Sequence, residues 1–197
     1  ERIDYASPVV LQPLRLENPR TGDSEYVIAV GVIPSADQRR VADMEISALG
    51  SSYQFYADGA YDGPWSGEMI ASPTVTERLS LEQGETVGVG NAEQSLTLTA
   101  VNDREMAAGF GEVPAIAMRL AELQALTGLD TADEADQILV STTNPAVESR
   151  LETVYPRTDV VSRSGLTGVD ATPTNLPVAM ALAATLVAGG IGVAFVA

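Results

Sequence analysis

The last 22 residues of the chain, 176–197, read LPVAMALAATLVAGGIGVAFVA and contain no charged side chain. A helix of this length spans about 33 Å at 1.5 Å per residue, and the hydrocarbon core of a bilayer is about 30 Å thick. Pro177 suits the first helical turn, where no backbone N–H is needed. The segment predicts a C-terminal apolar helix that spans or inserts into a membrane. A fully buried core element is the alternative, because Ala and Gly dominate the segment and no aromatic belt brackets it.

Small residues recur along one face of this predicted helix. Ala184, Ala188 and Gly192 follow one another at intervals of four. This spacing lets two helix backbones approach closely in lipid. We therefore predict that these three residues form a helix–helix packing site in the membrane.

The rest of the chain is strongly acidic. It contains 27 Asp and Glu residues against 11 basic residues, all of them arginine, and the formal net charge is −16. This balance argues against nucleic acid as a partner, because phosphate binding needs clustered Lys and Arg. Excess carboxylate without lysine is typical of proteins that work in concentrated salt, where screening suppresses self-repulsion. The alternative is a GC-rich genome that encodes Arg in place of Lys.

Three reactive residue types are missing, since the chain has no Lys, His or Cys. A Ser-His-Asp triad, a Schiff-base lysine, a disulfide and a thiolate or imidazole metal site are all excluded. The acidic run DTADEAD at 130–136 fails as an EF-hand loop, because Ala135 and Ser141 occupy the positions that require Gly and Glu. The sequence therefore predicts no catalytic residue, no cofactor and no metal site, and a protein that is not an enzyme.

The region 1–102 has the pattern of short strands separated by turns. Apolar or alternating runs occupy 9–16, 24–34, 51–57, 75–81, 84–89 and 94–101, and Gly, Pro, Asn and Asp punctuate them. Strands at this spacing favour an antiparallel β-sandwich of jelly-roll type. The only tryptophan, Trp65, lies in a turn-rich loop beside Tyr61. We interpret this loop as a packed loop at the end of the sandwich, with a carbohydrate platform as the alternative.

The hydrophobic period changes in the region 103–161, which we expect to be a helical section packed on the β-domain. Segment 113–127 has helical spacing, Thr131 and Glu134 form a capping box for a second helix to about residue 140, and Asn144-Pro145 suits the start of a third. Residues 162–175 are rich in Gly, Ser, Thr and Pro, and are predicted to tether this body to the segment 176–197. The sequence contains no evident internal repeat.

The acidic, lysine-free composition resembles that of haloarchaeal proteins. Together with its length and β-content, it is similar to the small jelly-roll shell proteins of membrane-containing viruses of haloarchaea. This resemblance implies a virion structural protein that self-assembles and contacts a lipid membrane through 176–197, with copies of itself or other shell proteins as partners. A membrane-anchored cell-surface adhesion or binding protein of a halophile is the alternative. A tethered hydrolase that uses two carboxylates is a third hypothesis.

Overall fold

The computed structural model of the protein describes residues 5–34, 40–41, 44–50, 53–56, 61–108, 111–129, 137–141 and 150. The chain divides into two compact units, Ala6–Ala107 with Glu112–Leu139, and Glu1–Tyr5 with Ala108–Gly111 and Val140–Ala197. Most described residues belong to the first unit, and the account below concerns that unit.

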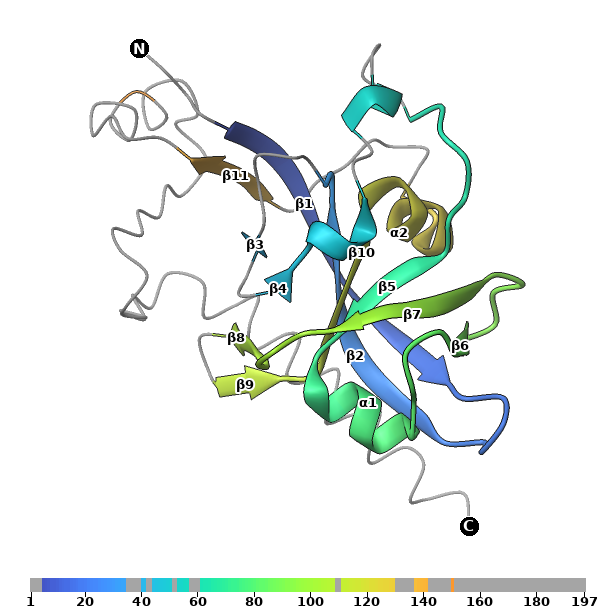
Figure 1. The fold of residues 1–197 in the computed structure, drawn as a ribbon. Coiled ribbons are helices and arrows are strands. Elements are labelled where there is room, and N and C mark those ends of the chain that lie inside the picture. The colour runs from blue at the N-terminus through green and yellow to red at the C-terminus, as the bar shows by residue number, and fades with distance from the viewer. Residues whose placement is uncertain are drawn as a thin grey trace. The chain divides into compact units, whose positions relative to one another are not determined.

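Eleven strands, two short 3-10 helices and two α-helices make up the described secondary structure (Figure 1). The strands are β1 (Tyr5–Glu17), β2 (Ser24–Val32), β3 (Arg40–Val41), β4 (Met44–Glu45), β5 (Glu68–Ala71), β6 (Thr86–Val89), β7 (Ser95–Val101), β8 (Met106–Ala108), β9 (Gly111–Val113), β10 (Ala115–Arg119) and β11 (Gln137–Ser141). The helices are η1 (Ser47–Leu49), η2 (Tyr53–Tyr56), α1 (Pro73–Leu79) and α2 (Leu120–Thr127).

Six of the strands close into a mixed barrel. Their order is β1-β2-β10-β5-β7-β6, and a further pairing of β6 with β1 closes the ring, while β11 adds to β1 from outside that ring. The pairs β2–β10 and β5–β7 are parallel, and the other four pairs are antiparallel. The closure between β1 and β6 consists of two residue pairs, Leu16 with Val89 and Glu17 with Gly88.

The barrel consists of two topologically equivalent halves. The first half is β1, β2, β5 and α1, and the second half is β6, β7, β10 and α2. Each half has an antiparallel hairpin, a connection, then a strand followed directly by a helix, and each hairpin's second strand runs parallel to the other half's third strand. The two halves are therefore related by a pseudo-two-fold axis. The axis passes between the paired residues Leu16 and Val89, and between Ile70 and Ala117.

The core follows this relation residue by residue. Equivalent residues of the two halves face the barrel interior and are buried in one hydrophobic cluster. The pairs are Leu14 and Val87, Leu16 and Val89, Val27 and Leu96, Ala29 and Leu98, Met69 and Ile116, and Ala71 and Met118. The sequences of the halves share little beyond apolar character at these positions, which explains why the duplication is not evident from the sequence.

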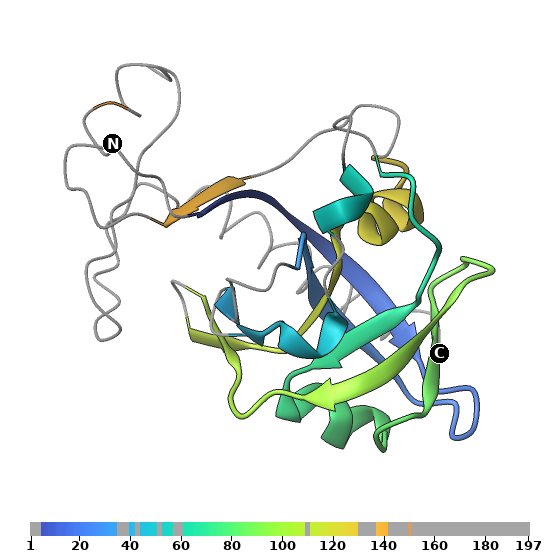
Figure 2. The same cartoon turned by 45° about the horizontal axis from the view of Figure 1, so that its top comes forward.

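The two helices lie at opposite ends of the barrel (Figures 1 and 2). Helix α1 begins after Ser72 with Pro73 in its first turn, and ends at Ser80, which has a left-handed φ of 51°. Helix α2 follows β10 with Arg119 as its N-cap, and ends at Gly128 with a φ of 74°. Leu79 of α1 and Leu123 of α2 are fully buried in the core, so each helix closes one end of the barrel.

The expectation of a mainly β protein is confirmed, and its arrangement differs from an antiparallel sandwich. The strands at 24–34, 84–89 and 94–101 are present as β2, β6 and β7. Two parallel pairs and the closure between β6 and β1 give a barrel in place of two stacked sheets. Parallel pairing depends on connections between distant segments, and local alternation carries no information about it.

Several predicted elements have a different secondary structure. The segment 75–81 was expected to be a strand, but α1 occupies Pro73–Leu79. Its buried residues Val75 and Leu79 are four apart, which is helical spacing, and Pro73 starts the helix. Residues 53–56 form η2 in place of a strand.

In the predicted helical section, a helix was expected over 113–127, and residues 115–119 instead form β10, with α2 starting at Leu120. Strand β10 lies between β2 and β5, so both of its faces are covered and its apolar run is continuous. The end of the second predicted helix, 137–140, is part of β11. Of the third predicted helix, only Arg150 is described, and its backbone is helical. The acidic run 130–136, the tether 162–175 and the segment 176–197 lie outside the described residues.

No helix among the described residues, which end at Arg150, is both long and apolar enough to cross a membrane. The predicted membrane helix at 176–197 lies beyond the described residues.

Candidate functional site

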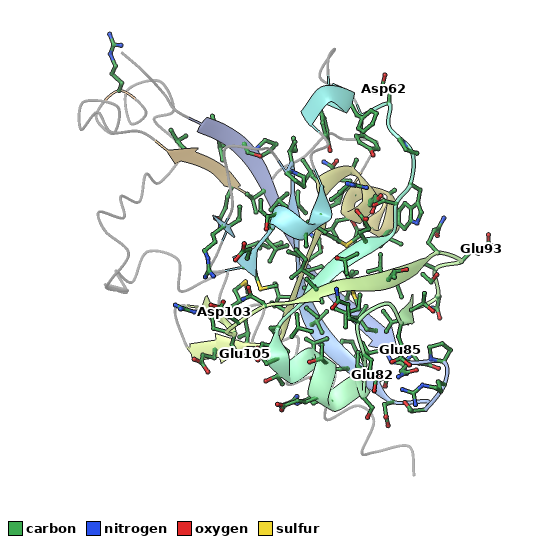
Figure 3. The ribbon with its side chains drawn as sticks, in the orientation of Figure 1. Asp62, Glu82, Glu85, Glu93, Asp103 and Glu105 are labelled. Carbon is green, nitrogen blue, oxygen red and sulfur yellow. The ribbon has the colours of Figure 1, made fainter. Side chains whose placement is uncertain are left out.

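The connection between β2 and β5 carries an exposed tryptophan at the end of the barrel where α2 lies. Trp65 is 41% exposed and belongs to the segment 61–67, here called the Trp65 loop. Asp62, near the start of this loop, points outward (Figure 3). Large aromatic side chains that stay partly exposed on soluble proteins are enriched at binding surfaces.

A buried carboxylate from α2 holds the C-terminal end of this loop. The side chain of Glu122 is 1% exposed. Its Oε1 accepts hydrogen bonds from the Ser66 backbone N–H at 2.5 Å and from Ser66 Oγ at 2.8 Å, and its Oε2 accepts one from the Gly67 N–H at 3.2 Å. Both carboxylate oxygens are thus engaged by the two residues that directly follow Trp65.

Arg119 places a positive charge next to the same carboxylate. Its Nη1 lies 3.9 Å from Glu122 Oε1, and its Nη2 lies 3.0 Å from Glu68 Oε2 and donates a hydrogen bond to the Leu49 carbonyl at 2.6 Å. The contact with Glu68 is an ion pair without hydrogen-bond alignment, since Glu68 Oε2 has no hydrogen-bond donor in the described part of the chain. The guanidinium is 12% exposed, so these contacts are weakly screened by solvent.

Gly67 allows the loop to approach the sheet. Its φ is 64°, and a Cβ atom there would lie 2.9 Å from the carbonyl oxygen of Ser95. The Gly67 carbonyl accepts a hydrogen bond from the Thr97 N–H at 2.6 Å. Only glycine combines this backbone conformation with so close a contact.

The N-terminal end of the loop is fixed by an aromatic cluster. The rings of Phe55 and Tyr61 pack edge to face with centroids 5.8 Å apart, and the Tyr61 hydroxyl donates a hydrogen bond to the Pro64 carbonyl at 2.9 Å. Burial raises the pKa of Tyr61 above its usual value; the positive charge of Arg119 opposes this shift and Glu122 adds to it. The loop is therefore held on both sides of Trp65.

This arrangement can present a rigid indole to a binding partner. Glu122 accepts three hydrogen bonds and is inaccessible to solvent, so its role is to hold the Trp65 loop on α2. A pre-organised aromatic residue loses little conformational entropy on binding, which favours affinity.

The sequence singled out Trp65 and Tyr61, but not the side chains that position them. Arg119 and Glu122 are three residues apart across the start of α2, and that region was expected to be the middle of a longer helix. With 27 acidic residues in the chain, nothing in the sequence distinguishes Glu122. The sequence held one weak signal for this pair, an Arg and a Glu at positions i and i+3 within an apolar segment.

The other sequence predictions fall largely outside this site. Ala184, Ala188 and Gly192 lie outside the described residues, as does the acidic run 130–136. Within the described residues, no group of three or more Asp and Glu side chains is placed to hold a metal ion.

The comparisons with known proteins show no family. No family model matches the chain, and no curated protein matches it. Among solved structures, one is similar at a TM-score of 0.48 and 10% identity, over 78% of this chain and 77% of the other, the extracellular domain of the noncanonic ABC-type transporter YknZ from Gram-positive bacteria. Another is a domain assigned to a permease protein of Porphyromonas gingivalis, at a TM-score of 0.44 and 8% identity, over 79% of this chain and 70% of the other. Both TM-scores are below 0.5, so no functional argument follows from them.

Proposed function

We propose that the protein is a structural component of a virion of a salt-adapted host, which self-assembles into a shell and contacts a lipid membrane through residues 176–197. The observation that carries the proposal is the division of the chain into an acidic body, with all of its charge in residues 1–170, and a charge-free apolar segment at the C-terminus. Such a chain is suited to hold a hydrated domain at a membrane surface.

The barrel is suited to be the repeating unit of such a shell. Its interior is filled by apolar side chains from both halves, and helices close both ends. The six strands of the sheet are joined into a ring, so we expect contacts between copies to depend mainly on side chains at defined surface positions. The rigidly held Trp65 is such a position, since Trp is enriched in the central contacts of protein interfaces.

The same tryptophan is the observation that favours the second candidate, a membrane-anchored cell-surface binding protein. An exposed indole on a fixed loop also suits the apolar face of a sugar or a partner protein. In that case Trp65 contacts a foreign ligand, and removing it leaves the oligomeric state of the protein unchanged.

The membrane contact is tested by flotation of the full-length chain with lipid vesicles in a density gradient at high salt. We expect the full-length chain to float with the vesicles, and a chain that ends at residue 175 to stay at the bottom. Equal behaviour of the two chains contradicts the membrane contact. The triple substitution of Ala184, Ala188 and Gly192 by leucine is expected to leave flotation intact and to weaken self-association in detergent.

The assembly is tested by sedimentation velocity and electron microscopy of the chain that ends at residue 175. We expect concentration-dependent oligomers at high salt that Trp65→Ala reduces, with Tyr26→Ala as a matched control at another exposed aromatic residue. A strictly monomeric protein at all concentrations contradicts the shell proposal and leaves the binding-protein candidate. Salt adaptation predicts loss of structure between about 3 M and about 0.1 M salt, and unchanged circular dichroism over that range refutes it.

A further inference from the structure

The α2 end of the barrel carries an exposed aromatic side chain that is held in one place. Trp65 is 41% exposed, and its loop is fixed by Glu122 on one side and by Tyr61 on the other. The indole N–H donates no hydrogen bond within the described part of the chain. A large side chain held in this way is pre-organised to enter a partner, because it has little conformational entropy left to lose.

A pocket of about 360 Å³ lies between β1, the turn after β6, and α2. Its walls are mainly apolar and are formed by Pro13, Leu14, Val89, Ala92 and Leu126. A cavity of about 150 Å³ is enough to bind benzene. The pocket therefore has room for the larger indole ring.

The loop and the pocket carry opposite charges. Arg15 is the charged residue that lines the pocket, and its Nη2 lies 3.2 Å from Glu17 Oε2 in an ion pair whose side chains are 41% and 46% exposed. A guanidinium has five N–H donors, so this one contact leaves donors for a second carboxylate. Asp62, three residues before Trp65, points outward and makes no side-chain hydrogen bond or ion pair within the described residues (Figure 3). The loop is thus complementary to the pocket in charge as well as in size.

The loop and the pocket occupy neighbouring positions on α2. Glu122, which holds the loop, and Leu126, which lines the pocket, are four residues apart and so lie on the same face of the helix. A surface patch that carries both parts of a contact can pair with a second copy of itself about a two-fold axis.

We propose that two copies of this chain associate through this patch, so that Trp65 of each copy enters the pocket of the other and Asp62 of each pairs with Arg15 of the other. The apolar walls remove the indole from water, as in the central contacts of protein interfaces. The ion pair fixes the orientation, because it forms only where a loop meets a pocket. The inference rests on the proposed self-assembly and identifies a contact within it.

The only tryptophan of the chain reports on this contact directly. The test follows Trp65 fluorescence of the full-length protein in detergent at high salt as the protein concentration is raised. We expect the emission to move to shorter wavelength in step with dimer formation in sedimentation velocity, because the indole leaves water. Oligomers without an emission shift overturn the inference and leave the proposed self-assembly intact, whereas a strictly monomeric protein contradicts both.

Charge reversal gives the decisive variants. Asp62→Arg and Arg15→Asp each place like charges at the contact, and each should raise the protein concentration at the midpoint of the emission shift by at least about tenfold. An equimolar mixture of the two variants pairs opposite charges at both contacts, and should return the midpoint to that of the unmodified protein. Asp23→Arg, the same change at an exposed residue of another turn, is the matched control. A mixture that does not recover, or an equal effect of Asp23→Arg, overturns the proposal.

A pocket variant tests the apolar part of the contact separately. Ala92 lines the pocket from an exposed position in the turn, so Ala92→Phe fills the pocket from within the same copy. We expect the Trp65 emission of this variant to stay unshifted at all concentrations. Ala6→Phe, at an exposed position of β1, is the control and should behave as the unmodified protein does. A normal emission shift in Ala92→Phe overturns the proposal.

Discussion

The two halves of the barrel have the same strand order and the same buried interior positions, but the contacts of their helices differ. The first turn of α1 carries Val75, which is fully buried in the core. The two-fold relation places Glu122 of α2 at the equivalent position, and Glu122 holds the Trp65 loop through three hydrogen bonds. The first half covers its helix end with Asn18, while Leu126 of α2 lines a pocket in the second half. The buried positions that the two halves share stabilise the barrel. The positions at which the halves differ hold the Trp65 loop and line the pocket.

The largest effect is expected from making the second half resemble the first at Glu122. In Glu122→Val, the backbone N–H groups of Ser66 and Gly67 lose their acceptor and Arg119 loses a compensating charge. We expect a loss of about 3 to 5 kcal/mol in the free energy of unfolding. Urea denaturation at fixed salt measures it, and Glu112→Val, at an exposed position, is the control. A loss below about 1 kcal/mol would show that the carboxylate is not needed to hold the loop.

The next effect concerns the contact between α2 and β2. A Cβ atom on Gly31 would lie 2.9 Å from Leu123 Cδ2 and 3.3 Å from Leu120 Cα, so Gly31→Ala forces α2 outward. We expect a loss of about 1 to 3 kcal/mol in thermal or urea unfolding. At Gly88 of β6 the nearest atom is the Glu17 carbonyl oxygen at 3.8 Å, and Gly88→Ala should cost little. Equal losses for the two variants would mean that α2 is not closely packed on β2.

The asparagines test the two-fold comparison directly. Asn18→Ala removes the donor to the Leu79 carbonyl and the acceptor of the Arg20 N–H, and we expect a loss of about 1 kcal/mol. Asn91→Ala removes no hydrogen bond within the described residues, and its unfolding midpoint should not change. Equal losses for the two variants would contradict the role assigned to the hydrogen bonds of Asn18.

The smallest effect is a pH dependence at the closed helix end. A hydrogen bond from the Glu82 N–H, with the ion pair to Arg20, lowers the pKa of Glu85 below its usual value. A carboxyl whose pKa is lower in the folded state adds stability above its unfolded pKa of about 4.3 and loses that stability as pH falls through the folded pKa. Unfolding by urea should become easier in that window, and Glu85→Gln should flatten the slope. Glu93→Gln, in the turn between β6 and β7, is the control. A pH slope in Glu85→Gln equal to that of the unmodified protein would contradict the assignment.

The sequence predicted some elements well for a local reason. β2 and β7 lie where apolar or alternating runs predict strands, because a strand's pattern repeats every two residues and is visible locally. Segment 75–81 was mistaken for a strand because Val75, Leu79 and Leu81 fit either period over so short a span. Segment 115–119 was mistaken for a helix because β10 is covered on both sides and loses its alternation.

Of the residues in the candidate site, only the exposed Trp65 could be predicted from the sequence. Trp65 is distinctive as the only tryptophan, in a turn-rich loop. Glu122 and Arg119 come from a helix more than 50 positions further along the chain, and their roles follow from folding β10 into the barrel beside β5. A pocket lined by Leu14 of β1, Val89 of β6 and Leu126 of α2 depends in the same way on the pairing of β1 with β6.

The sequence by itself determined the chemistry available to this protein. Missing Lys, His and Cys exclude whole classes of mechanism, and the positions of charge separate an acidic body from an apolar segment, because both are properties of composition and order along the chain. The tertiary structure decided the closure of the barrel, its two-fold relation, and the places where that relation is broken. Those features depend on pairings between residues far apart in the sequence, and such pairings leave no mark on local hydrophobic pattern.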